Sequence, residues 1–344
     1  MIQSQAVMTR EDNHNNSRTS AEKLHHCRPC ERFRLSLKIK SLTILPPYKG
    51  GIFRGAFGNA FRRAVCAMRA TDCDVCIIKG QCLYVALFQP PPTEGYKDAE
   101  KYRHAPPPYV LNPPLDNRQA FRPDDSMTFD LVLMGRAIDA LPYFIYSFID
   151  MGKRGLGRER GRYELTGVDL IRKDITTRIY DADTQTLKSF DKGAEPTPDN
   201  NEDIKSLTIR LLTPLRLKEK NSLVTHLTFP LFFERLTHRL ELLTAFYGTT
   251  GPIHIPNTLK EQAEQIQTTH DNLHWYEWER YSTRQESLMK LGGLKGEIVF
   301  EGHLAPFMPY IRLAEMVNVG QGTSFGLGRV EILCFKFQGK SGIF

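Results

Sequence analysis

One stretch of the sequence largely determines how this chain folds: Val319-Gly320-Gln321-Gly322-Thr323-Ser324-Phe325-Gly326-Leu327-Gly328-Arg329-Val330-Glu331-Ile332. Four glycines within nine residues interrupt any regular element, and the apolar residues that follow predict a strand. The amphipathic segment from Phe307 to Val317 predicts a helix directly before them. Glycines let main-chain N–H groups approach a ligand closely, and hydroxyl and guanidinium side chains add donors and a charge. We therefore interpret the stretch as a loop that enters a sheet and suits a phosphate backbone.

Two familiar nucleotide-binding patterns do not fit this loop. A mononucleotide-binding loop ends in Gly-Lys-Ser/Thr and opens a helix, whereas a dinucleotide fingerprint has a strand before its glycines and a helix after them. Here the predicted helix comes first and the strand comes last. Both nucleotide-cofactor interpretations are therefore excluded by context.

The order helix, Gly-x-Gly-x-x-Phe-Gly-x-Gly, strand resembles the signature of the RAMP superfamily of CRISPR-associated RNA-binding proteins. The C-terminal third also resembles the pre-crRNA-processing endoribonuclease of that superfamily. Three blocks carry the resemblance in the family's order: residues 275–285 (WYEWERYSTRQ), residues 291–298 (LGGLKGEI) and the glycine-rich loop. The resemblance implies an RNA-processing enzyme. It implies CRISPR repeat RNA or guide RNA as a partner, and other subunits of a CRISPR effector complex as further partners.

Composition indicates an ordinary globular protein with a polyanionic partner. The chain has 344 residues, enough for two domains, and a net charge of +7, although a modest positive excess also serves solubility alone. No apolar run approaches the ~20 residues of a membrane span, and the polar first thirty residues lack a signal-peptide core. We expect a cytoplasmic protein without a membrane partner, whose seven cysteines are thiols or metal ligands.

The spacing of four cysteines predicts a metal site. Cys66, Cys73, Cys76 and Cys82 fall within seventeen positions and include one Cys-x-x-Cys, a spacing that can converge tetrahedrally on one ion. A structural zinc would staple a segment that has few core residues of its own. Unliganded thiols are the alternative, and spacing does not exclude an iron–sulfur cluster. Similar cysteines occur at this position in one branch of the endoribonuclease family.

The element pattern predicts an α+β fold of two ferredoxin-like (RRM-like) domains in tandem, with the cysteine-rich metal-binding insertion in the first. We expect a disordered tail at 1–30, a first RAMP domain at 31–180, a linker at 181–203 and a second RAMP domain at 204–344. Both halves order as β, α, ββ, α, loop, β. The first half has its own glycine-rich segment at 152–162, whose basic residues predict phosphate contacts: Lys153, Arg154, Arg158, Arg160 and Arg162. A solvated basic turn is the alternative.

Metal-free RNA cleavage needs a base for the attacking 2′-hydroxyl, an acid for the leaving 5′-oxygen and cations for the extra negative charge. The sequence lacks the repeated Asp/Glu constellation of two-metal nucleases, so we expect no cofactor for catalysis. The candidate acids and bases are His303, Tyr281 and Lys49, and the candidate phosphate clamps are Arg54 and Arg284. For the loop we predict RNA contacts by Gly320, Gly322, Thr323, Ser324, Phe325, Gly326, Gly328 and Arg329. Structural roles are the alternative for His303 and Lys49.

One departure from the family's pattern affects the mechanism. Many relatives carry a histidine before, and a lysine after, the first glycine of the C-terminal loop, where this chain has Asn318 and Gln321. Neither residue titrates near neutral pH, so the pattern's proton-transfer groups are missing here. Three hypotheses follow: a metal-independent endoribonuclease that leaves a 2′,3′-cyclic phosphate, a RAMP-fold subunit that holds guide RNA without cutting it, and a zinc-containing scaffold without RNA.

Overall fold

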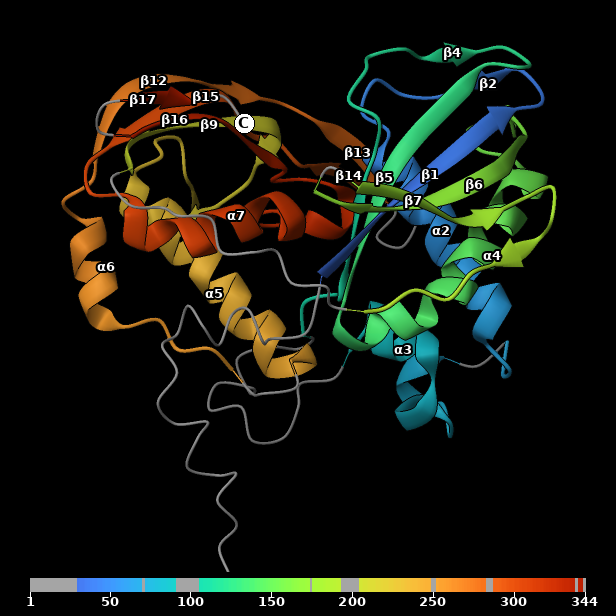
Figure 1. The fold of residues 1–344 in the computed structure, drawn as a ribbon. Coiled ribbons are helices and arrows are strands. Elements are labelled where there is room, and N and C mark those ends of the chain that lie inside the picture. Colours follow the sequence, from blue (N-terminus) through green and yellow to red (C-terminus); the bar gives the residue numbers. More distant parts are fainter. Residues whose placement is uncertain are drawn as a thin grey trace, which may run out of the picture.

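The computed structural model describes residues 30–69, 72–90, 105–173, 175–192, 204–248, 252–282, 287–337 and 340–342. Side chains are described throughout except in the strand segments 279–282, 287–290, 334–337 and 340–342. Most of the predicted tail and residues 193–203 of the predicted linker lie outside the described residues. Figure 1 shows two α/β halves side by side.

The first half is built on an antiparallel sheet in the order β3-β5-β1-β6-β7-β8. Its strands are β1 (Cys30–Ile39), β3 (Tyr109–Asn112), β5 (Ser126–Met134), β6 (Tyr163–Arg172), β7 (Ile175–Asp181) and β8 (Thr186–Leu187). Along β1 every second residue is buried, so its apolar side chains face the core and its basic ones face outward, as the alternation predicts. The inner face is covered by α2 (Gly50–Val65) and α4 (Leu141–Arg154), and Phe57 of α2 stacks on Phe144 and Phe148 of α4.

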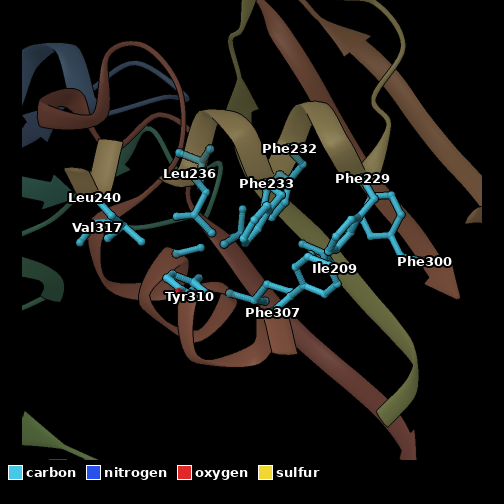
Figure 2. Packing of buried hydrophobic residues seen from close by; sticks show 14 of the residues in the cluster. Ile209, Phe229, Phe232, Phe233, Leu236, Leu240, Phe300, Phe307, Tyr310 and Val317 are labelled. Carbon is cyan, nitrogen blue, oxygen red and sulfur yellow. The ribbon is translucent and has the colours of Figure 1, made fainter. Parts of the chain in front are cut away.

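The second half repeats this plan with an antiparallel sheet in the order β12-β15-β9-β16-β17. Its strands are β9 (Ile204–Leu215), β12 (Gln267–Tyr276), β15 (Gly293–Glu301), β16 (Val330–Phe337) and β17 (Lys340–Gly342). Helices α5 (Phe229–Tyr247) and α7 (Met308–Val317) cover one face of the sheet. Figure 2 shows the core between them, where Phe229 and Phe233 of α5 meet Phe300 of β15 and Phe307.

The remaining described elements are short. They are β2 (Thr43–Ile44), η1 (Cys73–Val75), η2 (Lys79–Gln81), α3 (Leu83–Phe88), β4 (Ala120–Phe121), η4 (Gly135–Ala140), β10 (Lys218–Glu219), β11 (Ser222–Leu223), α6 (Asn257–Ala263), β13 (Glu279–Ser282), β14 (Ser287–Lys290), η5 (Ala305–Phe307) and η6 (Thr323–Phe325). No helix in the described ranges is long and apolar enough to cross a bilayer.

Three features of the structure have no clear local signal in the sequence. The proline-rich stretch 89–125 contains β3, whose four residues are all buried. Strand β14 pairs with β13, whereas the following strand β15 pairs with β12. Trp275 lies on strand β12 and is 36% exposed.

The two halves share part of their apolar packing. Val110 of β3 and Val132 and Met134 of β5 belong to the same buried cluster as the core of the second half. The Tyr247 hydroxyl, at the end of α5, donates to the Pro106 carbonyl oxygen over 2.7 Å. Because β3 and β5 form one side of the first sheet, that side is the surface on which the second half packs.

Candidate functional site

The glycine-rich loop joins α7 to β16 and has the backbone its glycines predict. Gly320, Gly322, Gly326 and Gly328 all have positive φ angles, between 67° and 85°. At Gly328 a Cβ would lie 1.7 Å from the Val319 carbonyl oxygen, because the loop closes on itself there through a Val319 N–H bond to the Gly328 oxygen. The conformation is therefore open only to glycine at this position.

The loop of the second half is docked on the first half. The Tyr48 hydroxyl donates to the Phe325 carbonyl oxygen over 2.7 Å, and the Asn318 amide donates to the Asn112 side-chain oxygen of β3 over 3.0 Å. A Cβ on Gly326 would lie 2.5 Å from the Leu111 carbonyl oxygen. Burial raises the pKa of Tyr48, with Arg329 opposing, so the hydroxyl remains a donor and serves the docking.

Part of the loop presents main-chain donors. Among the described residues, the N–H groups of Gly322, Thr323 and Ser324 have no hydrogen-bond acceptor. Three successive amides of this kind in a turn attract anions. Thr323 and Ser324 are only 5% and 8% exposed, so a ligand would reach this turn through a small opening.

Lys49 lies immediately before α2, at the edge of the docked loop. Its side chain is 0% exposed, and Nζ donates to the Asp116 carbonyl oxygen over 2.6 Å and to the Asp116 carboxylate over 3.2 Å. The next residue, Gly50, packs so closely on the loop that a Cβ would lie 2.0 Å from the Phe325 oxygen. The fold therefore brings one candidate acid or base from the first half to the loop of the second.

Arg54, one turn further along α2, also faces the loop. Its guanidinium lies 4.4 Å from the centre of the Phe88 ring and 5.6 Å from that of Phe325. Its Nε is buried without a hydrogen-bond partner among the described residues. A buried guanidinium donor without an acceptor is costly, and a phosphate oxygen would satisfy it.

A charged cluster crosses the boundary between the halves beside this site. Asp130 of β5 accepts from Arg32 over 2.5 Å and from Arg34 over 3.0 Å, and Arg329 of the loop lies 3.7 Å away. Burial works to raise the pKa of Asp130, but the bonds from Arg34 and Arg32 outweigh it and hold that pKa below its ordinary value. Burial lowers the pKa of Arg329, and Asp130 opposes this. The cluster carries three guanidinium groups and one carboxylate.

The basic turn of the first half lies at the end of its sheet where β1 finishes and the chain leads toward Lys49, because it immediately precedes Tyr163, which pairs with Ile39. All five predicted cations of this turn, Lys153, Arg154, Arg158, Arg160 and Arg162, are exposed. The Arg162 N–H donates to the Ser41 hydroxyl over 2.8 Å, and a Cβ on Gly161 would contact Thr43. The segment from Ser41 to Lys49 thus connects the basic turn to the glycine-rich loop.

His303 is far from this group of residues. It is exposed beyond the end of β15, and its neighbour Leu304 bonds to Ile204 at the start of β9. The loop bonds to β9 nine residues later, where the Thr213 hydroxyl donates to the Gly326 carbonyl oxygen. At about 3.3 Å per strand residue, the separation is about 30 Å. The structure therefore does not bring His303 to Lys49.

The block that holds Tyr281 lies nearer. Its Trp278 packs on Tyr48 with ring centres 4.4 Å apart, and Tyr281 follows in strand β13, where its backbone pairs with Leu288. The Tyr281 side chain and Arg284 lie outside the described residues. The hairpin β13–β14 is therefore held close to the docked loop.

The cysteine segment is remote from the loop, at the other end of α2. Cys66, Cys73, Cys76 and Cys82 are free, half-buried thiols. Burial raises the pKa of Cys73, Arg62 lowers it, and Cys66 and Cys82 raise it further, so three of the thiols are neighbours. Yet in the described ranges no three Cys, His, Asp or Glu side chains gather closely enough to hold a metal ion. The thiols as placed do not form a closed tetrahedral site.

Sequence reasoning missed two carboxylates of this region. Asp116 holds Lys49 and Asp130 holds the arginine cluster, and each binds its partner across 67 or more positions of the chain. Asp116, in a proline-rich stretch, has no sequence signal. Asp130 had one, because it interrupts the apolar strand Phe129 to Met134 and a buried carboxylate requires cationic partners.

Each half of the chain matches a protein-family model. Residues 209–330 match the family model described as CRISPR-associated endoribonuclease Cas6, and residues 28–192 match a model, AF_1859_N, described as an N-terminal domain. An uncharacterised protein of Archaeoglobus fulgidus is 26% identical over 300 residues, which are 84% of this chain and 92% of that protein.

The fold is shared with solved structures, among them two that contain Cas6. A product complex of Thermus thermophilus Cas6 matches with a TM-score of 0.52 and 16% identity, over 89% of this chain and 100% of that chain. A partial Cas6-RT-Cas1–Cas2 complex matches with a TM-score of 0.53 and 15% identity, over 92% of this chain and 48% of that chain. At these identities the likeness establishes a common ferredoxin-like architecture and no particular chemistry.

Proposed function

We propose that this chain, which carries a CRISPR-associated Cas6 endoribonuclease domain at residues 209–330, is a RAMP-fold protein of CRISPR RNA processing that cuts CRISPR repeat transcripts into guide RNAs without a metal ion. Its two α/β halves would act as tandem ferredoxin-like domains. The 2′-hydroxyl would attack the adjacent phosphorus in line and expel the 5′-oxygen. The products would be a 2′,3′-cyclic phosphate and a 5′-hydroxyl.

The observation that carries this proposal is the position of Lys49 against the glycine-rich loop. In the proposed complex, the amides of Gly322, Thr323 and Ser324 and the Arg54 guanidinium hold the scissile phosphate. The Lys49 ammonium stabilises the charge that develops on the phosphate and protonates the leaving oxygen. Because Lys49 is enclosed, RNA must first displace the Asp116 side chain, which is 53% exposed and also accepts from the Arg118 N–H over 3.0 Å.

The proposal assigns no proton transfer to the positions where many relatives have histidine and lysine. Asn318 is fully buried and its amide also donates to the Leu327 oxygen over 3.1 Å, so it stabilises the docked loop. Gln321 is exposed and cannot titrate. Lys49, with Tyr281 as the second candidate, would therefore supply the acid and the base.

The test uses a labelled CRISPR-repeat RNA in excess EDTA, beside the same RNA lacking the 2′-hydroxyl at the cut. We expect one cut that needs the 2′-hydroxyl, leaves a cyclic phosphate and continues in EDTA. Cutting that stops in EDTA while the protein stays folded would overturn the metal-independent mechanism. Tight RNA binding without any cut would mean that the chain holds guide RNA made by another enzyme.

A structural zinc at Cys66, Cys73, Cys76 and Cys82 is a separate part of the proposal. It is supported by the spacing and by the mutual proximity of Cys66, Cys73 and Cys82. Those thiols would have to approach one another further to complete the site. Since they lie at the far end of α2 from Lys49, the metal would stabilise the fold and take no part in cleavage.

A further inference from the structure

A basic cleft lies on the helical side of the first half, away from the loop site. It has a volume of about 490 Å³ and opens between the C-terminal halves of α2 and α4. Its charged and aromatic lining consists of Arg62, Arg63, Arg69, Tyr146, Asp150 and Arg154. Of these residues, only Arg154 belonged to a predicted RNA-binding segment.

The cleft keeps a strong positive excess, because four arginines face a single carboxylate. Asp150 accepts from Arg63 over 2.6 Å and from Arg154 over 3.0 Å, so it holds two guanidinium groups in place. Their side chains nevertheless remain 42% and 60% exposed. Guanidinium groups that are already oriented and still accessible lose little conformational entropy when they bind phosphate oxygens.

An exposed aromatic ring lines the cleft beside these cations. Tyr146 is 58% exposed. Tyr143, one helical turn earlier on α4 and outside the cleft lining, is 48% exposed. A positively charged groove combined with exposed aromatic rings is the arrangement by which proteins bind single-stranded nucleic acid, because bases stack on the rings while cations follow the backbone. An acidic protein surface would use the arginines but has no comparable need for the tyrosines.

We propose that this cleft binds single-stranded RNA that flanks the cleavage site, with its phosphates on the arginines and a base on Tyr146. This inference rests on the proposed function, since the same RNA must occupy the loop site. Arg63 lies fourteen positions after Lys49 along α2, which at 1.5 Å per residue is about 21 Å. At ~3.4 Å per stacked nucleotide, on the order of six nucleotides separate the two sites.

The test measures the affinity of the full-length protein for repeat RNAs whose flank on either side of the cut is shorter or longer than about six nucleotides. For the wild type, we expect a longer flank on one side to tighten binding about tenfold. In the variant R63Q/R69Q/Y146A we expect this gain to vanish. The slope of log affinity against log salt should fall by about 1.4 for the long RNA, since each lost phosphate contact on a single strand contributes ~0.7. Arg62 is left intact because it also contacts Cys66 and Tyr84.

Two controls keep the outcomes distinct. Lys192→Gln removes an exposed cation that pairs with Asp139, outside the cleft, and should preserve the gain from the longer flank. Equal thermal stability and equal affinity of variant and wild type for the short RNA show that the variant is folded. If the variant keeps the gain from the longer flank, or the wild type never shows it, the cleft proposal fails while cleavage still supports the proposed function. If the wild type binds no repeat RNA, both proposals fail.

Discussion

The Lys49 ammonium is enclosed by protein and donates to two oxygens of Asp116 and, over 3.4 Å, to the Pro47 carbonyl oxygen. We expect Lys49→Gln to slow cleavage ~10²–10⁴-fold, the range for loss of a positioned general acid or base. Gln can still donate to the Asp116 carbonyl oxygen, so the local fold should survive. The measurement is the single-turnover cleavage rate at saturating RNA.

RNA affinity and thermal stability separate a catalytic from a structural role for Lys49. If Lys49 acts on the reacting phosphate, both should stay close to wild-type values, because only the rate is then affected. If its role is structural, both should fall together with the rate. Lys192→Gln again provides the exposed-lysine control. A variant that cuts at the wild-type rate would remove Lys49 from the mechanism and leave Tyr281 as the candidate.

Gly326 tests the docking of the loop. Its φ is 81°, and a Cβ would lie 2.4 Å from Pro113 Cδ and 2.5 Å from the Leu111 oxygen of the first half. We expect Gly326→Ala to lower the free energy of unfolding by at least ~1–2 kcal/mol from the left-handed backbone alone, and further because the halves must separate. Denaturant unfolding measures the loss.

Gly55→Ala is the matched control for Gly326→Ala. It adds the same methyl group within α2, where nothing lies within 4 Å of the added Cβ. Replacing a helical glycine should stabilise the protein by about 0.5–1 kcal/mol. Equal effects at the two glycines would contradict the docked geometry.

At the scale of elements, the sequence predicts those whose apolar pattern is strong. Burial alternates along β1, and α2, α4, α5 and α7 each bury an apolar face. The helix predicted from Phe307 to Val317 is α7, at Met308–Val317. Strand β12 has no such apolar pattern, since most of its side chains are exposed; its main-chain pairing with β15 defines it, with a side-chain contact from Lys295 to the Tyr276 ring. Strand β3 could not be predicted from the sequence, because the prolines on both sides of it indicate an irregular segment.

Less of the site could be predicted, because its contacts join distant parts of the chain. The loop's glycines indicate its conformation, but nothing local indicates that Tyr48 would bond to Phe325, or Asn318 to Asn112. His303 shows a related limit. Its side chain makes it a candidate acid or base, but which end of the sheet it occupies depends on the pairing of β15 with β9.

The cysteine segment gives an element-scale prediction. If zinc binds there, purified protein should contain about one zinc per chain, and strong chelators should lower the melting temperature because the free energy of metal binding adds to that of folding. Cys73→Ser should reproduce that loss, since Cys73 lies beside Cys66 and Cys82. Cys30→Ser, outside this segment, is the control for zinc content. Metal-free protein with unchanged stability would favour simple thiols.

At the scale of the whole molecule, the proposed site exists only while the halves are docked. Lys49 and Arg54 come from the first half, and the loop comes from the second. The contacts that join them include an apolar cluster, the Tyr48 and Asn318 hydrogen bonds, and the Asp130 ion pairs. Substitutions at this interface should therefore reduce the cleavage rate even where the substituted residue does not contact RNA.

The contribution of the Asp130 ion pairs to holding the halves together can be measured from the pH dependence of stability. Because its pKa in the folded protein is depressed below the unfolded value of ~3.9, its ion pairs contribute in full above that value. They are lost as pH falls through the folded pKa. We expect Asp130→Asn to lower the free energy of unfolding at neutral pH by about 2 kcal/mol, less than for a fully buried pair because Arg32 and Arg34 are partly hydrated.

The difference in unfolding free energy between Asp130→Asn and wild type should shrink on acidification below pH ~4, whereas Asp139→Asn, at an exposed pair, should change little. Calorimetry adds a second readout: since Arg329 loses its partner across the boundary, the two halves should begin to unfold separately. A variant with the wild-type acid dependence and a single unfolding transition would mean that the ion pairs do not hold the halves together.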